Sequence, residues 1–276
     1  MPAVLQQSCC VYPWTQGSDD QMKVEWTIRE NRDAAAVIPT MDAQQQRVQS
    51  LIRELDTNGV DSLVVVDSGP DFRFSRSMNA GIRELLSEPR VKYILLSNDD
   101  VYDISSAFNG MIRALKDGNA DYVTPYVNGG RPSRMFTRSV AKLVFSFGLR
   151  YHAPMHALRV FRAVKAHANG AKPLFTAPPI SIRNEVISVQ PFSLFKREVL
   201  EEEMFDENFQ NGVEDEELMY RLSVKGYMGH TNAAWNIHHV GGASFRTLHA
   251  KMEVGSYYGS VEQFCSNMGY FGAKYR

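Results

Sequence analysis

The sequence has few cysteines, no long apolar run and no excess of either charge. Cys9, Cys10 and Cys265 are an odd and badly spaced set, which builds neither a disulfide framework nor a zinc-ligand pattern. No apolar run approaches the roughly 18 residues of a membrane-spanning helix. The first residues also lack the basic-then-apolar plan of a secretory leader. We therefore expect a cytoplasmic protein with reduced cysteines.

The balance of charges limits the class of partner. Thirty Lys and Arg stand against 31 Asp and Glu in 276 residues, a net charge of -1, which argues against a general nucleic-acid binder. The distribution is uneven, because residues 131–184 hold ten Lys and Arg without an acid and residues 198–217 hold ten acids without a base. The length is enough for one α/β domain with insertions and a sizeable core.

Strand and helix patterns alternate through the first half of the chain. Strands are expected at 34–40, 62–67, 92–98 and 120–124, and helices at 42–57, 78–87 and 104–116. Such alternation predicts βαβ units with right-handed crossovers, and hence a mostly parallel sheet. Residues 1–33 have an irregular pattern that predicts an N-terminal arm or a small added layer. This segment could be a partner-binding arm, but a lid or edge strand at 24–28 is favoured.

The second half has a less regular pattern. Two basic amphipathic helices are expected at 135–150 and 156–167, a return strand at 187–195, a helix at 214–225 and a late strand near 235–242. The remaining residues, 245–276, form an aromatic-rich helical tail that could serve as an oligomer interface.

Two adjacent carboxylates, Asp99 and Asp100, follow the short apolar run of residues 92–98. Ligands of open α/β sheets collect outside the carboxyl ends of the strands. A divalent cation that carries a diphosphate would offset the repulsion between the two acids. The alternative is a pair of solvated turn acids that cap the helix beginning near Ile104.

The ends of the first three strands bring further polar residues to the same edge, near Thr40, Asp67 and Asp99. The Asp67 carboxylate could accept a hydrogen bond from the imide N–H of uracil or thymine. It could instead be an Asx-turn residue that starts the Asp67-Ser68-Gly69 turn.

Four consecutive acids, Glu214 to Glu217, begin the helix expected at 214–225, which is more than the helix dipole needs. Asp215 could act as general base for an acceptor hydroxyl. Farther along, His238 or His239 could supply an imidazole as a metal ligand, or could be a satisfied core histidine.

Several motifs together resemble the family 2 inverting glycosyltransferases of the GT-A fold. Phe205-Asp206-Glu207, Glu214-Asp215-Glu216-Glu217-Leu218, Arg221 and Gly226-Tyr227 are similar to the FDE…ED-x-D-L…R…G-Y signature. The segment 239–244, HVGGAS, looks like the H-x-G-G-x-S segment of rhamnosyltransferase-like members. Three positions depart from the pattern: Asn98 replaces an Asp, Val213 a Gly and Glu217 an Asp.

The resemblance implies a domain plan and a role for each matching residue. It implies a Rossmann-like GT-A domain over 34–244, with a nucleotide-binding half at 34–130 and an acceptor-binding half with a helical insertion at 131–244. The implied donor contacts are Pro39, Thr40, Asp67, Arg76, Asn79, Asn98 and Asp99. The implied ligands of Mn²⁺ or Mg²⁺ are Asp100 and His239, and the implied catalytic acids are Asp215 and Glu214.

The implied reaction is transfer of a sugar from a nucleoside-diphosphate sugar, UDP or dTDP favoured, to a hydroxyl of a glycan or glycolipid. The acid-free block 131–184 would suit a lipid-linked acceptor or a membrane surface, or could pair with the acidic block 198–217. A nucleotidyltransferase is less favoured, because Thr40-Met41-Asp42-Ala43 replaces its Gly-rich loop and Lys. A non-catalytic module that binds nucleotide-sugars is the third alternative.

Overall fold

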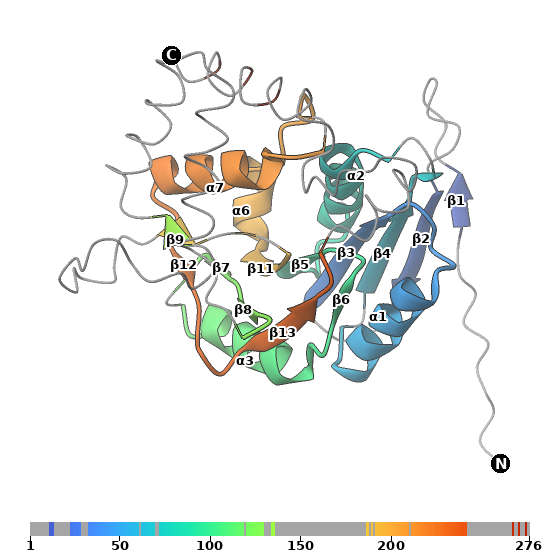
Figure 1. Cartoon of the computed structure of the whole chain (residues 1–276), viewed down its shortest axis with the longest axis horizontal. Coiled ribbons are helices and arrows are strands. Elements are labelled where there is room, and N and C mark those ends of the chain that lie inside the picture. Colours follow the sequence, from blue (N-terminus) through green and yellow to red (C-terminus); the bar gives the residue numbers. More distant parts are fainter. Residues whose placement is uncertain are drawn as a thin grey trace.

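The computed structural model describes the backbone of residues 11–13, 23–28, 33–60, 62–69, 72–118, 120–129, 134–135, 186–187, 189, 191–209 and 211–241, together with Asn267, Tyr270 and Lys274. A central sheet organises these residues (Figure 1). Its strands, in spatial order, are β1 (Val11–Pro13), β2 (Lys23–Ile28), β4 (Ser62–Asp67), β3 (Ala34–Thr40), β5 (Tyr93–Ser97), β11 (Phe192–Lys196), β7 (Tyr122–Val123) and β12 (Gly229–His230).

The sheet is mostly parallel in strand direction. β3 is parallel to both of its neighbours, β4 and β5, and β12 is parallel to β7. β11 is antiparallel to β5 and β7, and β2 is antiparallel to β4 and β1. β2 and β11 therefore run against all the other strands. The α/β class with a mostly parallel sheet flanked by helices is confirmed. A strand at residues 24–28 is also confirmed, but the prediction that it lies at the edge was wrong, because β2 pairs with both β4 and β1.

Helices cover both faces of the sheet. One face packs against α1 (Gln46–Thr57) and α3 (Ser105–Lys116), and the other against α2 (Phe74–Leu86), α6 (Arg197–Glu202) and α7 (Glu214–Lys225). Successive side chains of a strand point to opposite faces, so Ala35 and Val37 join one core while Ala36 and Ile38 join the other. Continuous apolar strands are the sequence mark of this double burial.

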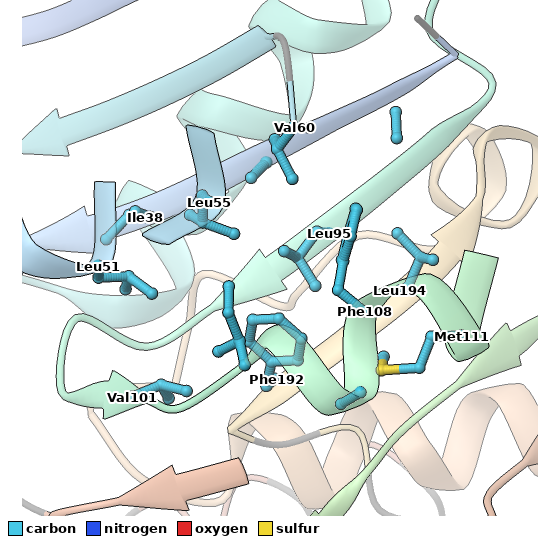
Figure 2. Packing of buried hydrophobic residues seen from close by; sticks show 14 of the residues in the cluster. Ile38, Leu51, Leu55, Val60, Leu95, Val101, Phe108, Met111, Phe192 and Leu194 are labelled. Atoms are coloured by element: carbon cyan, nitrogen blue, oxygen red, sulfur yellow. The ribbon is translucent and has the colours of Figure 1, made fainter. Parts of the chain in front are cut away.

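The core on the α1 and α3 side is shown in Figure 2. Leu51 and Leu55 of α1 and Phe108 and Met111 of α3 pack against the central strands, and all four side chains are buried. Full burial of such a side chain is worth about 1.5–3 kcal/mol, so this packing fixes the helices against the sheet.

A second, small sheet lies beyond the end of β5. It consists of β6 (Val101–Tyr102), β13 (Asn236–His239) and β8 (Tyr126–Val127), with β13 in the centre. β13 is antiparallel to β6, with His239 opposite Val101. This pairing brings the late histidines beside the segment that follows β5. A separate antiparallel pair joins β9 (Arg134–Met135) and β10 (Val186–Ile187).

The bounds of several elements differ from the predicted ones. α1 begins at Gln46 rather than at Asp42, because the Asp42 side chain accepts the Gln44 N–H at 2.9 Å and makes a turn. α2 begins at Phe74 rather than Met78. The strand predicted at 187–195 was wrong as one strand: β10 and β11 are separate, and Pro191 between them cannot donate to a ladder.

The predicted helical insertion falls mostly outside the described residues. Met135, expected to begin a helix, lies in strand β9 instead. Residues 136–150 and 156–167 are not among those that the structure describes. Of the helices in the described part, none is both long and apolar enough to cross a membrane.

Candidate functional site

The side chains at the carboxyl ends of β3, β4 and β5 form a group that we call the strand-end cluster: Thr40, Asp67, Asn98, Asp99 and Asp100. Thr40 and Asp67 are register partners, and the Thr40 hydroxyl donates to Oδ2 of Asp99 at 2.9 Å. The structure thus brings together the three strand ends that the sequence predicted at one edge. Asp99 and Asp100 are only 4% and 5% exposed, which argues against two solvated turn acids.

Arg47 is a member of this region that sequence reasoning missed. Its Nη2 lies 3.1 Å from Oδ2 of Asp99, so a cation on α1 offsets the negative charge of the buried acid. Its Nε is buried and has no hydrogen-bond partner among the residues that the structure describes. No motif marks Arg47, because it is one of several polar residues on an amphipathic helix.

The Asp67 carboxylate stabilises the local turn by accepting backbone hydrogen bonds, and it can accept a further one. Its two carboxylate oxygens accept the backbone N–H groups of Ala43 at 3.1 Å and Gly69 at 3.2 Å. The second bond is the Asx turn that the sequence offered as an alternative. Each carboxylate oxygen has a further lone pair, so these two bonds do not use up the capacity of Asp67 to accept hydrogen bonds. Pro39, the neighbour of Thr40, is buried within β3.

Asp100 meets His239 directly. Nε2 of His239 lies 2.9 Å from Oδ1 of Asp100, and Nδ2 of Asn98 lies 3.4 Å from the same ring nitrogen. Asn128, which the sequence did not single out, holds the backbone of His239 from both sides, accepting its N–H at 3.0 Å and donating to its carbonyl at 2.9 Å.

His238 belongs to a different environment. Its ring stacks on Tyr102 with centroids 5.1 Å apart, and its Nε2 lies 3.8 Å from the exposed Asp103. Successive residues of a strand face opposite sides, which explains why only one of the two histidines reaches Asp100. The geometry therefore favours His239 over His238 as the partner of the strand-end cluster.

Asp100 and His239 are of the residue types that bind divalent cations. The 2.9 Å between their donor atoms is the distance of an ordinary hydrogen bond or ion pair. It is also compatible with two adjacent ligands of an octahedral ion, which lie about 3.0 Å apart when each is about 2.1 Å from the ion. Among the described residues, no three His, Cys, Asp or Glu side chains gather to hold a metal. The remaining ligands would have to be diphosphate oxygens and water, the usual arrangement for Mg²⁺.

The second part of the site is the segment 203–217, which we call the acid loop and which includes the first turn of α7. Asn211, Gly212 and Val213 all have positive φ, at 49°, 138° and 75°. Such a backbone is costly for a β-branched residue, and Val213 is also 1% exposed. It stands where the resembling family has Gly, the residue that adopts this conformation without strain.

Asn211 ties the acid loop to the rest of the site. Its side chain accepts the Phe74 N–H at 2.7 Å and donates to the Phe72 carbonyl at 3.0 Å. Those two residues follow the carboxyl end of β4, so the start of α7 lies on the same side of the sheet as Asp67. The acid loop and the strand-end cluster therefore share one edge.

Glu214 and Asp215 are adjacent but differ in environment. Glu214 is 4% exposed and its carboxylate accepts the Gly212 N–H. Burial, with the nearby charge of Asp215, raises the pKa of Glu214 from 4.5 to about 8. Glu214 therefore holds a proton at neutral pH, while Asp215 is half-buried at the start of the helix.

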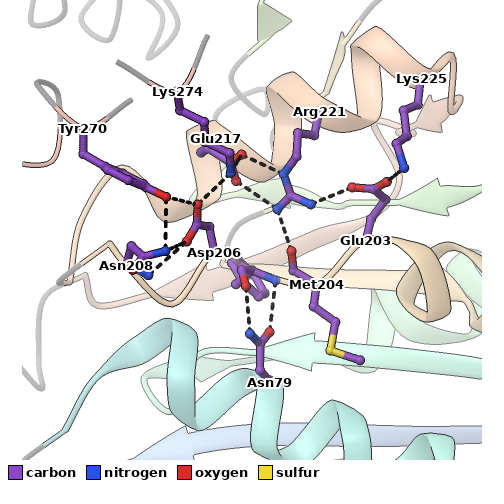
Figure 3. A network of polar contacts seen from close by, with 11 residues as sticks. Asn79, Glu203, Met204, Asp206, Asn208, Glu217, Arg221, Lys225, Tyr270 and Lys274 are labelled. Carbon is purple, nitrogen blue, oxygen red and sulfur yellow. Dashed lines mark hydrogen bonds and ion pairs between the residues drawn. The ribbon is translucent and has the colours of Figure 1, made fainter. Parts of the chain in front are cut away.

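Asn79 and Arg76, two predicted donor contacts, lie on α2. Asn79 is buried and uses both polar atoms of its side chain on the acid loop: it donates to the Phe205 carbonyl at 2.8 Å and to Glu207 at 2.9 Å, and it accepts the Phe205 N–H at 3.0 Å. Figure 3 shows Asn79 pointing from α2 toward this loop. Asn79 therefore holds the acid loop through its side-chain amide. Arg76 is half-buried on the same helix.

Glu217 anchors α7 rather than facing a ligand. It is fully buried and forms a two-pronged ion pair with Arg221, at 2.7 and 2.9 Å (Figure 3). Arg221 continues to Glu203 at 2.6 Å and to the Met204 carbonyl at 2.5 Å. Glu217 stands where the ED-x-D-L motif of the resembling family has its second Asp. In this structure it is part of a buried network of ion pairs.

Comparison with known proteins gives likeness of fold alone. No protein-family model matches the sequence, and no curated protein does. Among solved structures, A197 from STIV is similar over 75% of this chain and 85% of its own, with 12% identity and a TM-score of 0.43. TarS 1-349 of S. aureus is similar over 88% of this chain and 72% of its own, with 10% identity and a TM-score of 0.45.

A structure of the same TarS fragment in complex with UDP is similar over 79% of this chain and 63% of its own, at 10% identity and a TM-score of 0.44. This chain covers 38% of the larger TarS structure. Likenesses at these identities and TM-scores say nothing about what this chain binds or does.

Proposed function

We propose that the protein is a metal-dependent inverting glycosyltransferase that uses a nucleoside-diphosphate sugar. The observation that carries the proposal is the meeting of Asp100 and His239 at 2.9 Å beside Asn98, 141 residues before His239 in the sequence. The resemblance to family 2 glycosyltransferases assigns these two residues to one metal site, and the fold brings them together at the end of a central strand.

The strand-end cluster would bind the nucleotide. The Asp67 carboxylate would accept the imide N–H of a uracil or thymine base, which favours UDP or dTDP over GDP. Asp99, oriented by Thr40 and Arg47, would accept hydrogen bonds from the ribose hydroxyls. Pro39, Asn98 and the half-buried Arg76 complete the proposed donor contacts.

Asp100 and His239 would hold Mn²⁺ or Mg²⁺ against the diphosphate. When bound, such an ion supplies positive charge that stabilises the leaving nucleoside diphosphate. The protein contributes two ligands at a preset separation, and it holds the His239 backbone through Asn128.

Asp215 would act as the general base. A carboxylate oxygen of Asp215 takes the proton from the acceptor hydroxyl, and the hydroxyl oxygen forms a bond to the anomeric carbon. The bond from that carbon to the diphosphate oxygen breaks, and its electron pair leaves with the diphosphate. Attack from the opposite face inverts the anomeric centre. Glu214 keeps its own proton at neutral pH and so adds no second negative charge beside the base.

The proposed acceptor is a hydroxyl of a glycan or a lipid-linked sugar. Ten Lys and Arg without an acid in residues 131–184 suit a phosphate-bearing acceptor or an anionic membrane surface that presents it. The acceptor and the membrane contact rest on sequence composition, and the donor site can be tested without them.

A thermal-shift screen tests the donor site. UDP-, dTDP- and GDP-sugars are added with and without Mn²⁺ to the wild type, Asp100→Ala and His239→Ala. One nucleotide-sugar should stabilise the wild type only with Mn²⁺, and both variants should lose that shift. Asp103→Asn removes the charge of an exposed acid beside His238, and asparagine tolerates the left-handed backbone at this position (φ 57°), so this matched control should behave as the wild type. A screen in which no nucleotide shifts the wild type would contradict the proposal.

The second arm separates an enzyme from a binding module. Asp215→Asn should reduce transfer from the selected donor by about 10³-fold or more while the nucleotide-dependent thermal shift is retained. Donor binding without turnover by the wild type, tried with glycan and polyprenyl-diphosphate acceptors, would assign the chain to the non-catalytic class instead.

A further inference from the structure

Three residues near the end of the sequence contact the acid loop. Asn267, Tyr270 and Lys274 each have helical backbone geometry, and their spacing of three and four residues is that of one helix face. All three hydrogen-bond to residues of the acid loop, from 55 to 68 positions earlier in the chain. We call these three residues the tail latch.

Asn267 holds the strained turn before α7. Its Nδ2 donates to the Gly212 carbonyl at 2.7 Å, and the N–H of the same Gly212 is bonded to the Glu214 carboxylate. Three consecutive residues with positive φ keep their conformation only when the surroundings fix it. Asn211 supplies one such contact through Phe72 and Phe74, and Asn267 supplies the other.

Tyr270 and Lys274 hold Asp206. The Tyr270 hydroxyl and Lys274 Nζ donate to Oδ2 of Asp206 at 2.9 and 2.6 Å, and the Tyr270 ring packs edge-on against Phe209 with centroids 5.1 Å apart. Burial acts to raise the pKa of Asp206, but hydrogen bonds from Lys274, Asn208 and Tyr270 overcome it and hold the pKa at about 2. Asp206 is thus an anion at every physiological pH.

Lys274 also reaches Glu217, the fully buried acid of α7, at 2.9 Å (Figure 3). One ammonium group therefore bridges two carboxylates that lie on either side of Glu214 and Asp215 in the sequence. Arg221 already forms ion pairs with Glu217 and Glu203. If it moved to Asp206 in place of Lys274, one of these buried acids would lose its cation.

We propose that the tail latch positions the acid loop for catalysis, with Asn267, Tyr270 and Lys274 as positioning residues that act through Gly212, Asp206 and Glu217. This inference deepens the proposed function, because it takes Asp215 as the base that the latch aligns. A shift of about 1 Å in a catalytic group can cost 10²-fold in rate, so a loosened loop should lower turnover more than donor affinity.

The test uses full-length variants in the transfer assay. Lys274→Ala and Asn267→Ala should each lower kcat by about tenfold or more while KM for the donor changes less than twofold. Lys274→Arg keeps the charge and should restore most of the loss. Lys92→Ala, which removes a lysine from a surface ion pair with Asp33, is the matched control and should keep the wild-type kcat.

Amide hydrogen exchange gives a readout that does not depend on activity. Exchange in residues 205–217 should be faster in both alanine variants than in the wild type, and unchanged in Lys92→Ala. Asn267→Ala retains every charge, so it serves if Lys274→Ala does not fold. Unchanged exchange in this segment would overturn the latch whatever happens to kcat. A wild type without transfer activity would instead refute the proposed function and leave the exchange test standing.

Discussion

The strand-end cluster and the acid loop lie at one edge of the sheet but are held there by different means. Thr40, Asp67 and Asp99 are placed by parallel strands, whose ladders fix the register of one strand end against the next. The described residues of the acid loop are in no β-strand, so no ladder of hydrogen bonds between strands fixes their position. The acid loop is held by Asn79, by Asn211 and by ion pairs around Arg221 and Lys274.

This difference has an energetic meaning. A strand end is held by the apolar packing of both cores, so the loss of one polar bond should leave its position almost unchanged. A buried ion-pair network depends on each partner, because removing one leaves an uncompensated charge in a place of low polarity. The acid loop should therefore be the more sensitive part of the site.

The largest effect is expected at Glu217. Glu217→Ala leaves the guanidinium of Arg221 and the ammonium of Lys274 without their shared acid, which should lower the free energy of unfolding by about 3–5 kcal/mol. Urea denaturation followed by circular dichroism measures this.

Glu201→Ala provides the matched control, since it removes a carboxylate from an i,i+4 pair with Arg197 on the surface. An exposed pair is worth about 0–1 kcal/mol. Equal losses for the two variants would mean that the buried network is no more important than a surface pair, and the contrast between the two regions would fail.

The same difference decides what the sequence could predict. Strand ends are visible in sequence, because an apolar run stops at a polar residue, and parallel topology then places Thr40, Asp67 and Asp99 together. His239 came from the resemblance to a family motif, and the small sheet shows why it, rather than His238, reaches Asp100. Arg47 and Asn128 were missed because their partners lie far away in the sequence and no local pattern encodes such pairs.

The acid loop was predicted only in part. The helix bounds of α7, Glu214 to Lys225, agree with the pattern of acids before an apolar stripe and a closing Gly226. The anchoring role of Glu217 and the contacts of Lys274 were not predictable, because they join residues 57 positions apart. The domain division and the roles assigned to the site residues remain predictions.

A second prediction concerns pH and Glu214. Its pKa is raised from 4.5 to about 8 by burial and by the charge of Asp215, so between those values the folded protein keeps a proton that the unfolded chain has lost. The free energy of unfolding should therefore fall as pH rises from about 4.5 to 8, and then change no further on account of this group.

Glu214→Gln keeps an acceptor for the Gly212 N–H and removes the titration. Between pH 5 and 8 this variant should lose less stability than the wild type, as measured by urea midpoints at several pH values. Glu201→Gln, an exposed acid, should follow the wild type. Parallel curves for Glu214→Gln and the wild type would show that Glu214 does not carry a proton at neutral pH.

The smallest effect tests the strain at Val213. Val213→Gly removes a buried side chain, at a cost of about 1.5–3 kcal/mol, and relieves a left-handed backbone that costs a β-branched residue about 1–2 kcal/mol. The new glycine also costs about 0.5–1 kcal/mol of backbone entropy, so a net loss of about 1.5 kcal/mol is expected.

Val64→Gly in β4 is the counterpart in the sheet, equally buried but in extended backbone. No strain is relieved there, and glycine adds about 0.5–1 kcal/mol of backbone entropy, so a loss of about 3 kcal/mol is expected. The burial and entropy terms are common to both substitutions, so the remaining difference of about 1.5 kcal/mol measures the strain in the acid loop. Equal losses would mean that Val213 adopts its left-handed backbone conformation without an energetic cost. Contacts such as the hydrogen bond from Asn267 to Gly212 would then not be needed to stabilise a strained turn.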